Sequence, residues 1–120
     1  MLPIKRRIKT ESFPKIMKEG FFVHSDNFYL KILSPTSLEL RGANLPPSRF
    51  GFVVPNKVKK TSVGRHLIKR RITAVVEKLL INIKSGFSVI VFAKKDVSAL
   101  PYSDIEKEIK DLLIKGKLVS

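Results

Sequence analysis

Residues 61–82 have the sequence TSVGRHLIKRRITAVVEKLLIN, and this stretch decides the fold because its apolar residues recur every three or four positions. The spacing predicts one long helix that begins at Thr61 or Ser62 and ends at about Asn82. Its buried stripe should consist of Ile68, Ile72, Val75, Val76 and Leu79. A helix with one apolar side needs an apolar layer to pack on, which here should be a sheet.

Strands are predicted on both sides of this helix. Residues 50–55, Phe-Gly-Phe-Val-Val-Pro, form a β-rich run that ends at Pro55. After the helix, Ser85-Gly86 opens the continuous apolar run Phe87–Ala93, which is typical of an interior strand covered on both faces. Further upstream, residues 21–25, 27–33 and 37–41 are predicted to form a meander of three strands.

Two further helices are predicted at the ends of the chain. Residues 11–19 form the first, with Thr10 as N-cap, Pro14 in the first turn and Gly20 as its end. The last helix should begin with a capping box between Ser103 and Glu106 and end at Gly116. Its predicted apolar face is Ile105, Ile109, Leu112 and Leu113. The sequence therefore predicts an α+β sandwich with the order α-β-β-β-β-α-β-α.

The composition indicates one soluble domain with a polyanionic partner. The chain has 120 residues, of which 43% are hydrophobic and 28% charged, so residues 1–120 fit a single domain. Lys and Arg number 24 against 10 Asp and Glu, which gives a net charge of +14. A small domain with that much self-repulsion is expected to meet a partner of opposite charge.

Several classes of function are disfavoured. The absence of Cys excludes disulfides and thiolate sites, and two His make a His-based metal centre unexpected. No apolar run approaches the roughly 20 residues of a membrane-spanning helix. Residues 1–7 lack the apolar segment of a signal peptide, so we expect a cytoplasmic protein. No catalytic triad or carboxylate pair stands out, and we predict no catalytic side chain.

The positive charge is concentrated near the long helix. No acidic residue lies between Glu39 and Glu77, although that interval contains nine Lys and Arg residues. On a 3.6-residue helix, Arg65, His66, Lys69 and Arg70 share one flank that is separate from the apolar stripe. A solvated basic face would explain this flank alone. The acid-free interval and the run Lys57-Val-Lys59-Lys60 before the helix favour nucleic-acid binding through phosphates.

These residues carry a resemblance to a known family. The segment Arg49-Phe-Gly-Phe-Val-Val-Pro-Asn-Lys57-Val58, followed by Arg65-His-Leu-Ile-Lys69-Arg70-Arg71-Ile72, resembles the bacterial ribonuclease P protein component. Gly86–Lys94 resembles that family's late strand, and residues 5–28 resemble its opening helix and strands. The resemblance covers nearly the whole chain in the family's order.

The chain departs from the family pattern at several positions. The family's Arg-Asn-Arg is Arg65-His66-Leu67 here, whereas Lys69 and Arg70 match. A family aromatic in the first helix is Met17, and a strand aromatic is Lys31, with Tyr29 on the same face. We therefore interpret the chain as a divergent member.

The resemblance implies a specific fold and function. The fold would be the α/β sandwich shared with certain ribosomal-protein domains, with a left-handed β-α-β crossover instead of the usual right-handed one. The chain would be the protein subunit of a ribonucleoprotein that removes the 5′ leader of precursor tRNA. The RNA subunit would perform the Mg²⁺-dependent hydrolysis, and the protein alone would not cleave. We expect one protein per RNA, no membrane partner and no small-molecule substrate.

The resemblance also implies two sets of binding residues. The catalytic RNA would contact the long helix and the segment before it, through Lys57, Lys59, Lys60, Arg65, His66, Lys69, Arg70 and Arg71. The single-stranded leader would lie in a cleft formed by Phe13, Met17, Tyr29, Lys31 and Arg49.

Each set has a plainer interpretation. Phe13 and Met17 are equally well explained as core residues, and His66 as an exposed helix histidine. Residues 1–9 are either a flexible basic arm on the RNA or a terminal tail. The main alternative function is a ribosome-associated or other structural RNA-binding protein on the same fold.

Overall fold

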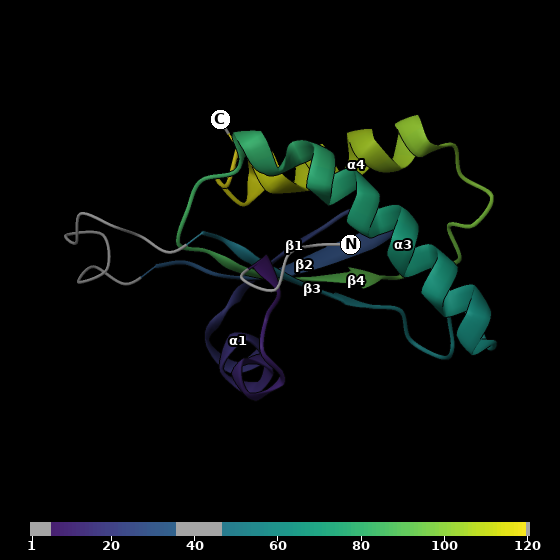
Figure 1. The fold of residues 1–120 in the computed structure, drawn as a ribbon, viewed down its shortest axis with the longest axis horizontal. Coiled ribbons are helices and arrows are strands. Elements are labelled where there is room, and N and C mark those ends of the chain that lie inside the picture. The colour runs from purple at the N-terminus through teal and green to yellow at the C-terminus, as the bar shows by residue number, and fades with distance from the viewer. Residues whose placement is uncertain (1–5, 36–46, 120) are drawn as a thin grey trace.

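A computed structural model describes residues 6–35 and 47–119 of the chain. Its strands β1 (Phe21–His24), β2 (Phe28–Leu33), β3 (Arg49–Val53) and β4 (Ser88–Ala93) form one sheet in the order β1-β2-β4-β3. Helix α1 (Phe13–Glu19) lies on one face, and α3 (Ser62–Leu79) and α4 (Tyr102–Lys115) lie on the other (Figure 1). The predicted α+β sandwich is confirmed. The strand predicted over residues 37–41 lies outside the described residues.

Strand β4 occupies the interior of the sheet. It pairs antiparallel with β2 and parallel with β3, and α3 makes the connection between the two parallel strands. All residues from Val89 to Ala93 are buried, because helices cover both faces at this strand. This position explains the uninterrupted apolar run in the sequence.

Helix α3 follows the periodicity of its sequence. The five residues of the predicted stripe, Ile68, Ile72, Val75, Val76 and Leu79, are all buried. A short 3₁₀ turn, Leu80–Asn82, extends the helix to the predicted end. The hydroxyl of Thr61 caps the first turn by accepting a hydrogen bond from the backbone N–H of Gly64 at 3.1 Å.

Helix α4 buries the four residues predicted for its apolar face, but the predicted capping box is wrong. Pro101 occupies the N-cap position, and no side chain caps the helix. Glu106 is instead paired with Lys78 of α3, whose Nζ lies 3.2 Å from Oε2. The helix begins at Tyr102, so Ser103 lies inside the first turn and does not occupy the N-cap position that a capping box needs.

Helix α1 is preceded by a 3₁₀ turn, Thr10–Ser12, so Ser12 is the N-cap and the prediction of Thr10 is wrong. Pro14 lies in the first turn and Gly20 ends the helix, as predicted. The backbone of Gly20 is extended, so a positive φ is not the reason for a glycine there. A Cβ at this position would lie 2.6 Å from the carbonyl oxygen of Ile16 and 2.9 Å from that of Ile32.

Candidate nucleic-acid interface

The outer flank of α3 presents cations to solvent. Because successive residues of a helix are about 100° apart, the flank lies beside the buried Ile68 stripe and does not overlap it. His66, Lys69 and Arg70 are exposed and have no hydrogen-bond or ion-pair partner among the described residues. These three side chains also line a hollow between α3 and Phe52 of β3. This part of the predicted surface is free to meet phosphates.

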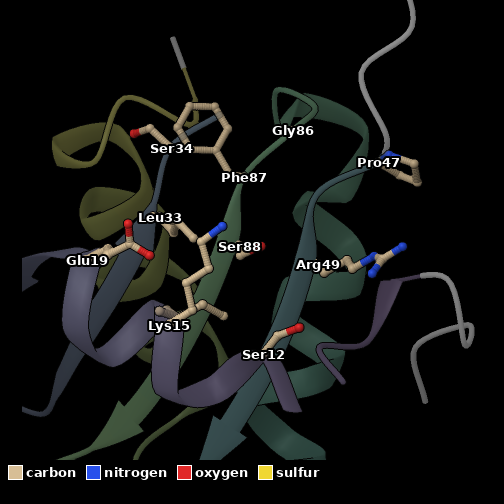
Figure 2. A pocket seen from close by; sticks show the side chains of 11 residues that line it. Ser12, Lys15, Glu19, Leu33, Ser34, Pro47, Arg49, Gly86, Phe87 and Ser88 are labelled. Atoms are coloured by element: carbon tan, nitrogen blue, oxygen red, sulfur yellow. The ribbon is translucent and has the colours of Figure 1, made fainter. Parts of the chain in front are cut away.

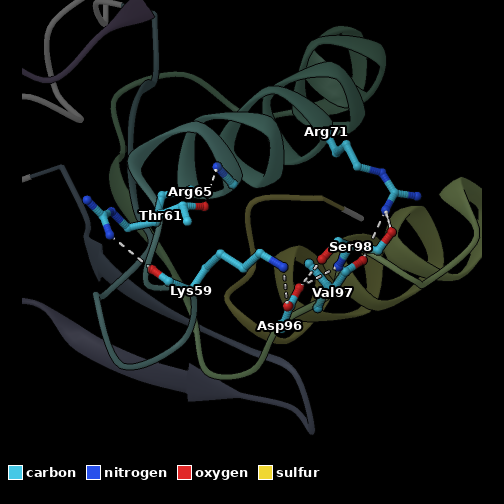
Figure 3. A network of polar contacts seen from close by, with 8 residues as sticks. Lys59, Thr61, Arg65, Arg71, Asp96, Val97 and Ser98 are labelled. Atoms are coloured by element: carbon cyan, nitrogen blue, oxygen red, sulfur yellow. Dashed lines mark hydrogen bonds and ion pairs between the residues drawn. The ribbon is translucent and has the colours of Figure 1, made fainter.

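Arg65 lies on the same flank but has a structural contact as well. Its Nη1 donates a hydrogen bond to the carbonyl oxygen of Lys59 at 3.0 Å (Figure 3). The same atom donates to the carbonyl oxygen of Lys60 at 2.8 Å. These bonds hold the segment before α3 against the first turns of the helix. The acceptors are neutral, so Arg65 contributes its full charge to the flank.

Lys59 has an acidic partner that lies outside the acid-free interval between Glu39 and Glu77. Its Nζ lies 3.0 Å from Oδ2 of Asp96, in the segment that follows β4. The hydroxyl and the backbone N–H of Ser98, together with Lys59, lower the pKa of Asp96 to about 2. The ion pair is solvent-exposed at both ends, so a strong polyanion can compete for Lys59. Lys57 and Lys60 are exposed and have no such partner among the described residues.

Arg71 binds the protein itself. Its Nη1 donates to the carbonyl oxygens of Val97 at 3.0 Å and Ser98 at 2.7 Å (Figure 3). Its Nη2 donates to the carbonyl of Leu100. The side chain is half-buried, whereas its neighbour Arg70 is exposed. The structure therefore brings Arg71 to the segment between β4 and α4 and away from the cationic flank.

An aromatic face lies on the side of the sheet that carries α1, and we define it by Phe22, Tyr29 and Phe92. The Tyr29 and Phe92 rings are stacked with centroids 4.4 Å apart, and the Phe22 ring meets Tyr29 edge-on at 5.8 Å. Lys31 extends along the same face, 7% exposed, with Nζ 3.7 Å from the centroid of the Phe22 ring. Phe22 itself is 54% exposed.

Phe22 and Phe92 were not predicted as members of this face. The strand register places them there, because it pairs Phe22 with Lys31 and Phe92 with Tyr29. Directly paired residues point to the same face of a sheet, so knowledge of the register would have identified both. The register cannot be read from the alternation of β1, because Phe21 and Phe22 are both aromatic.

Helix α1 separates two flanks above the sheet. Ile16 is buried beneath the helix, and Phe13 and Met17 lie to one side of it at about 60° and 100° around the axis. Phe13 is half-buried and packs against the cluster of Ile16, Ile90 and Phe92, whereas Met17 is 42% exposed. The two residues lie on the same flank of α1, with the ring of Phe13 over Gly51 of β3.

Arg49 lies on the other flank of α1. It lines a hollow together with Ser12, Lys15 and Ser88 (Figure 2). Its register partner is Ser88, four residues before the Phe92 that contacts Tyr29, a separation of about 13 Å along β4. The five predicted cleft residues therefore do not form one group. Arg49 Nε is buried without a hydrogen-bond partner among the described residues.

Two negative findings concern only the described part of the chain. None of its helices is long and apolar enough to cross a membrane. No three His, Asp or Glu side chains of residues 6–35 and 47–119 gather in a way that could hold a metal ion.

Comparison with solved structures defines the class of fold. The ribonuclease P protein of Staphylococcus aureus superposes with a TM-score of 0.76 at 22% identity, covering 96% of this chain and 98% of that one. The protein of Thermotoga maritima gives a TM-score of 0.75 at 21% identity, covering 91% and 96%. The molecule thus has the α/β fold of these small bacterial proteins.

Comparison of sequences defines the family. The model of the family described as Ribonuclease P matches residues 2–117. The ribonuclease P protein component of Rippkaea orientalis is 31% identical over 119 residues, which cover 98% of this chain and 91% of that protein. The chain belongs to the ribonuclease P protein family, as the resemblance indicated.

Proposed function

We propose that this chain is the protein subunit of ribonuclease P and that it docks on the catalytic RNA through the outer flank of α3. The observation that carries this proposal is the pair of exposed cations Lys69 and Arg70, which have no partner among the described residues and lie next to a stripe that is fully buried. Like charges one turn apart destabilise a helix, and phosphates between them reverse that effect. The N-terminus of α3 has no acidic residue in its first turn and adds partial positive charge.

We assign the 5′ leader of precursor tRNA to the aromatic face. Phe22 and Tyr29 offer rings on which unpaired bases can stack without sequence preference, and Phe13 packs against the same apolar cluster as Tyr29. Lys31 has no acidic partner among the described residues, and its buried ammonium adds positive charge beneath the aromatic face without being an exposed phosphate contact. Arg49 takes no part in this assignment, because α1 lies between it and the aromatic rings.

In this proposal the RNA subunit carries the chemistry. Phosphate oxygens are the hard ligands that Mg²⁺ prefers, and RNA supplies them in number. The described residues do not offer a fitting cluster, so no step of our proposal passes through a metal held by the protein. The protein's contribution is to bind the RNA and to position the leader. One protein per RNA and a cytoplasmic location complete the assignment.

Reconstitution with the RNA subunit tests the proposal directly. The protein should stimulate cleavage of precursor tRNA at low Mg²⁺ and should not cleave it alone. Binding to ribosomes without such stimulation would favour the alternative of a structural RNA-binding protein.

The docking flank is tested by K69A/R70A. Both side chains are exposed and free of intramolecular partners, so their loss should leave folding intact. Binding to the RNA subunit should weaken, and the slope of log K against log salt should decrease by about 1.8 if each residue neutralises one phosphate of a duplex-like RNA. The matched control is K107A/K110A, which removes two exposed lysines of α4. An equal effect in both variants would show that only net charge matters.

The leader assignment is tested by Phe22→Ala, which removes an exposed ring. Affinity of the reconstituted enzyme should decrease for precursor tRNA by about fivefold or more, which is the lower end of the range for base stacking. Affinity for mature tRNA, which has no leader, should not change. Equal effects on both RNAs would place the leader elsewhere.

A further inference from the structure

A second basic and aromatic hollow lies at the other end of the molecule from the N-terminus of α3. It has a volume of about 650 Å³ and is lined by the start of β1, the end of β2, the segment before β4 and the end of α4. We call it the Phe87 hollow and define it by Phe21, Lys84, Phe87, Lys115 and Lys117. In Figure 1 these segments meet near the C-terminus, whereas α3 begins at the opposite side of the molecule.

The hollow has a fixed frame. Gly116 ends α4 so close to β2 that a Cβ there would clash with Cδ1 of Ile32. The next residue, Lys117, has a φ of 65°, which turns the chain back so that the N–H of Leu118 donates to the carbonyl of Leu113 at 3.0 Å. The N–H of Lys84 then donates to the carbonyl of Leu118 at 2.8 Å. These bonds fix the backbone that carries the three lysines.

The charge of the hollow is uncompensated. Lys84, Lys115 and Lys117 are exposed, and none has an ion-pair or side-chain hydrogen-bond partner in the described part of the chain. No acidic side chain of the described residues lines the hollow. The carbonyl end of a helix adds negative potential, which holds lysines near it but does not neutralise three of them. The chemistry of the hollow therefore favours an anionic partner.

The aromatic rings narrow the class of anion. Phe21 is 43% exposed although it lies beside the core, and Phe87 is half-buried at the edge of the hollow. Rings and lysines that line one hollow suit a single strand of RNA, whose bases stack while its phosphates meet the ammonium groups. A duplex would offer the phosphates but not the faces of its bases.

Strand β1 connects this hollow with the aromatic face. Phe21 and Phe22 are consecutive residues of an edge strand, so their side chains point to opposite faces of the sheet. Phe22 faces Tyr29 and Lys31, and Phe21 faces the Phe87 hollow. An RNA strand that leaves the aromatic face across the β1 edge therefore meets the hollow next.

We propose that the Phe87 hollow binds the part of the single-stranded 5′ leader that lies farther from the tRNA than the part on the aromatic face. This inference rests on the proposed leader binding and extends it to a second site. It predicts that lengthening the leader beyond the aromatic face raises the affinity of the enzyme for precursor tRNA only while the hollow is intact.

The experiment compares two precursor tRNAs with the reconstituted enzyme. One has a leader of about 3 nucleotides and the other of about 15, a range that spans the site sizes known for single-strand binders. The variants are K84Q/K115Q, which removes charge, and Phe21→Ala, which removes a ring. The control K107Q/K110Q removes the same charge from exposed positions of α4. Thermal unfolding confirms that each variant is folded.

We expect affinity for the long-leader precursor to decrease by about fivefold or more in Phe21→Ala, which is the lower end of the range for one stacked base. In K84Q/K115Q its salt slope should decrease by about 1.4, for two contacts to a single strand. The short-leader precursor does not reach the hollow and should bind all variants alike. If Phe21→Ala impairs folding, K84Q/K115Q alone tests whether the hollow binds the leader.

Three results would overturn the inference. Equal losses for both leaders, or equal losses in the variants and the control, would show a general effect of charge or folding. Unchanged binding of the long leader by both variants would show that the hollow is not on its path. Failure of the proposed leader binding itself looks different, because Phe22→Ala would then leave both precursors unaffected.

Discussion

Replacing Arg71 by Lys separates its role in folding from a role in RNA binding. The substitution preserves the charge but removes the planar fork that donates to the carbonyls of Val97, Ser98 and Leu100. If Arg71 contacted RNA as a cation, Arg71→Lys would be nearly silent. If it fastens the segment between β4 and α4 to α3, the variant should be less stable and should still bind RNA.

The contacts set the size of the effect. Hydrogen bonds that involve a charged group contribute about 1.5–3 kcal/mol each when measured by deletion. The carbonyl of Ser98 is solvent-exposed and regains water, whereas the bonds to Val97 and Leu100 are partly buried. One ammonium can replace one of these two bonds, so we expect Arg71→Lys to cost about 2 kcal/mol. For a domain of this size that corresponds to a decrease in Tm of about 8 °C.

Thermal unfolding measures the stability, and titration with the RNA subunit measures the binding. Arg71→Met, which also removes the charge, should be at least as unstable as Arg71→Lys. The neighbouring Arg70→Lys is the control, because its side chain is exposed and has no partner among the described residues. A Tm of Arg71→Lys equal to that of the parent would refute the assignment to folding. Weaker RNA binding by Arg71→Met at an unchanged Tm would assign Arg71 to the RNA instead.

Two further predictions concern stability. Burial alone would raise the pKa of Glu108, but hydrogen bonds from Ser25 and Asn27 lower that pKa below its ordinary value of 4.5. Ionised Glu108 therefore contributes fully to the free energy of unfolding above pH 4.5, and this contribution is lost as the pH falls through the lower pKa of the folded state. In urea unfolding, Glu108→Gln should be less stable than the parent at neutral pH, and the difference should shrink in acid. A difference that stays constant with pH would contradict this. Gly116→Ala should destabilise the protein by about 1–3 kcal/mol, because its methyl group would clash with Ile32. Ile32→Val in the same chain should recover part of that loss. Additive effects of the two substitutions in a double-mutant cycle would rule out the clash.

Local periodicity is the reason that the helices could be predicted. The buried stripe of α3 and the apolar face of α4 follow from spacing alone, because a helix repeats every 3.6 residues whatever surrounds it. The apolar run of β4 indicated an interior strand for a similar reason. The end signals were less dependable, since α4 begins at Tyr102 and Ser103 is therefore not the N-cap of a capping box.

The division of the cations could not be predicted. Arg70 and Arg71 are adjacent and chemically identical, yet one is exposed and the other is bound to three carbonyls. Lys59 lies in an acid-free interval, yet it pairs with Asp96 from 37 residues further along the chain. Each outcome depends on which loop packs beside the helix.

The sequence by itself determined the class of fold, the helix that carries the positive charge and the kinship with the ribonuclease P proteins, because these are properties of spacing, composition and residue order. Only the tertiary structure decided which cations are free, that α1 separates Arg49 from the aromatic rings, and that Phe21 and Phe22 serve opposite faces. Those features depend on strand register and loop packing. Both are set by contacts between residues far apart in the chain, which no local pattern encodes.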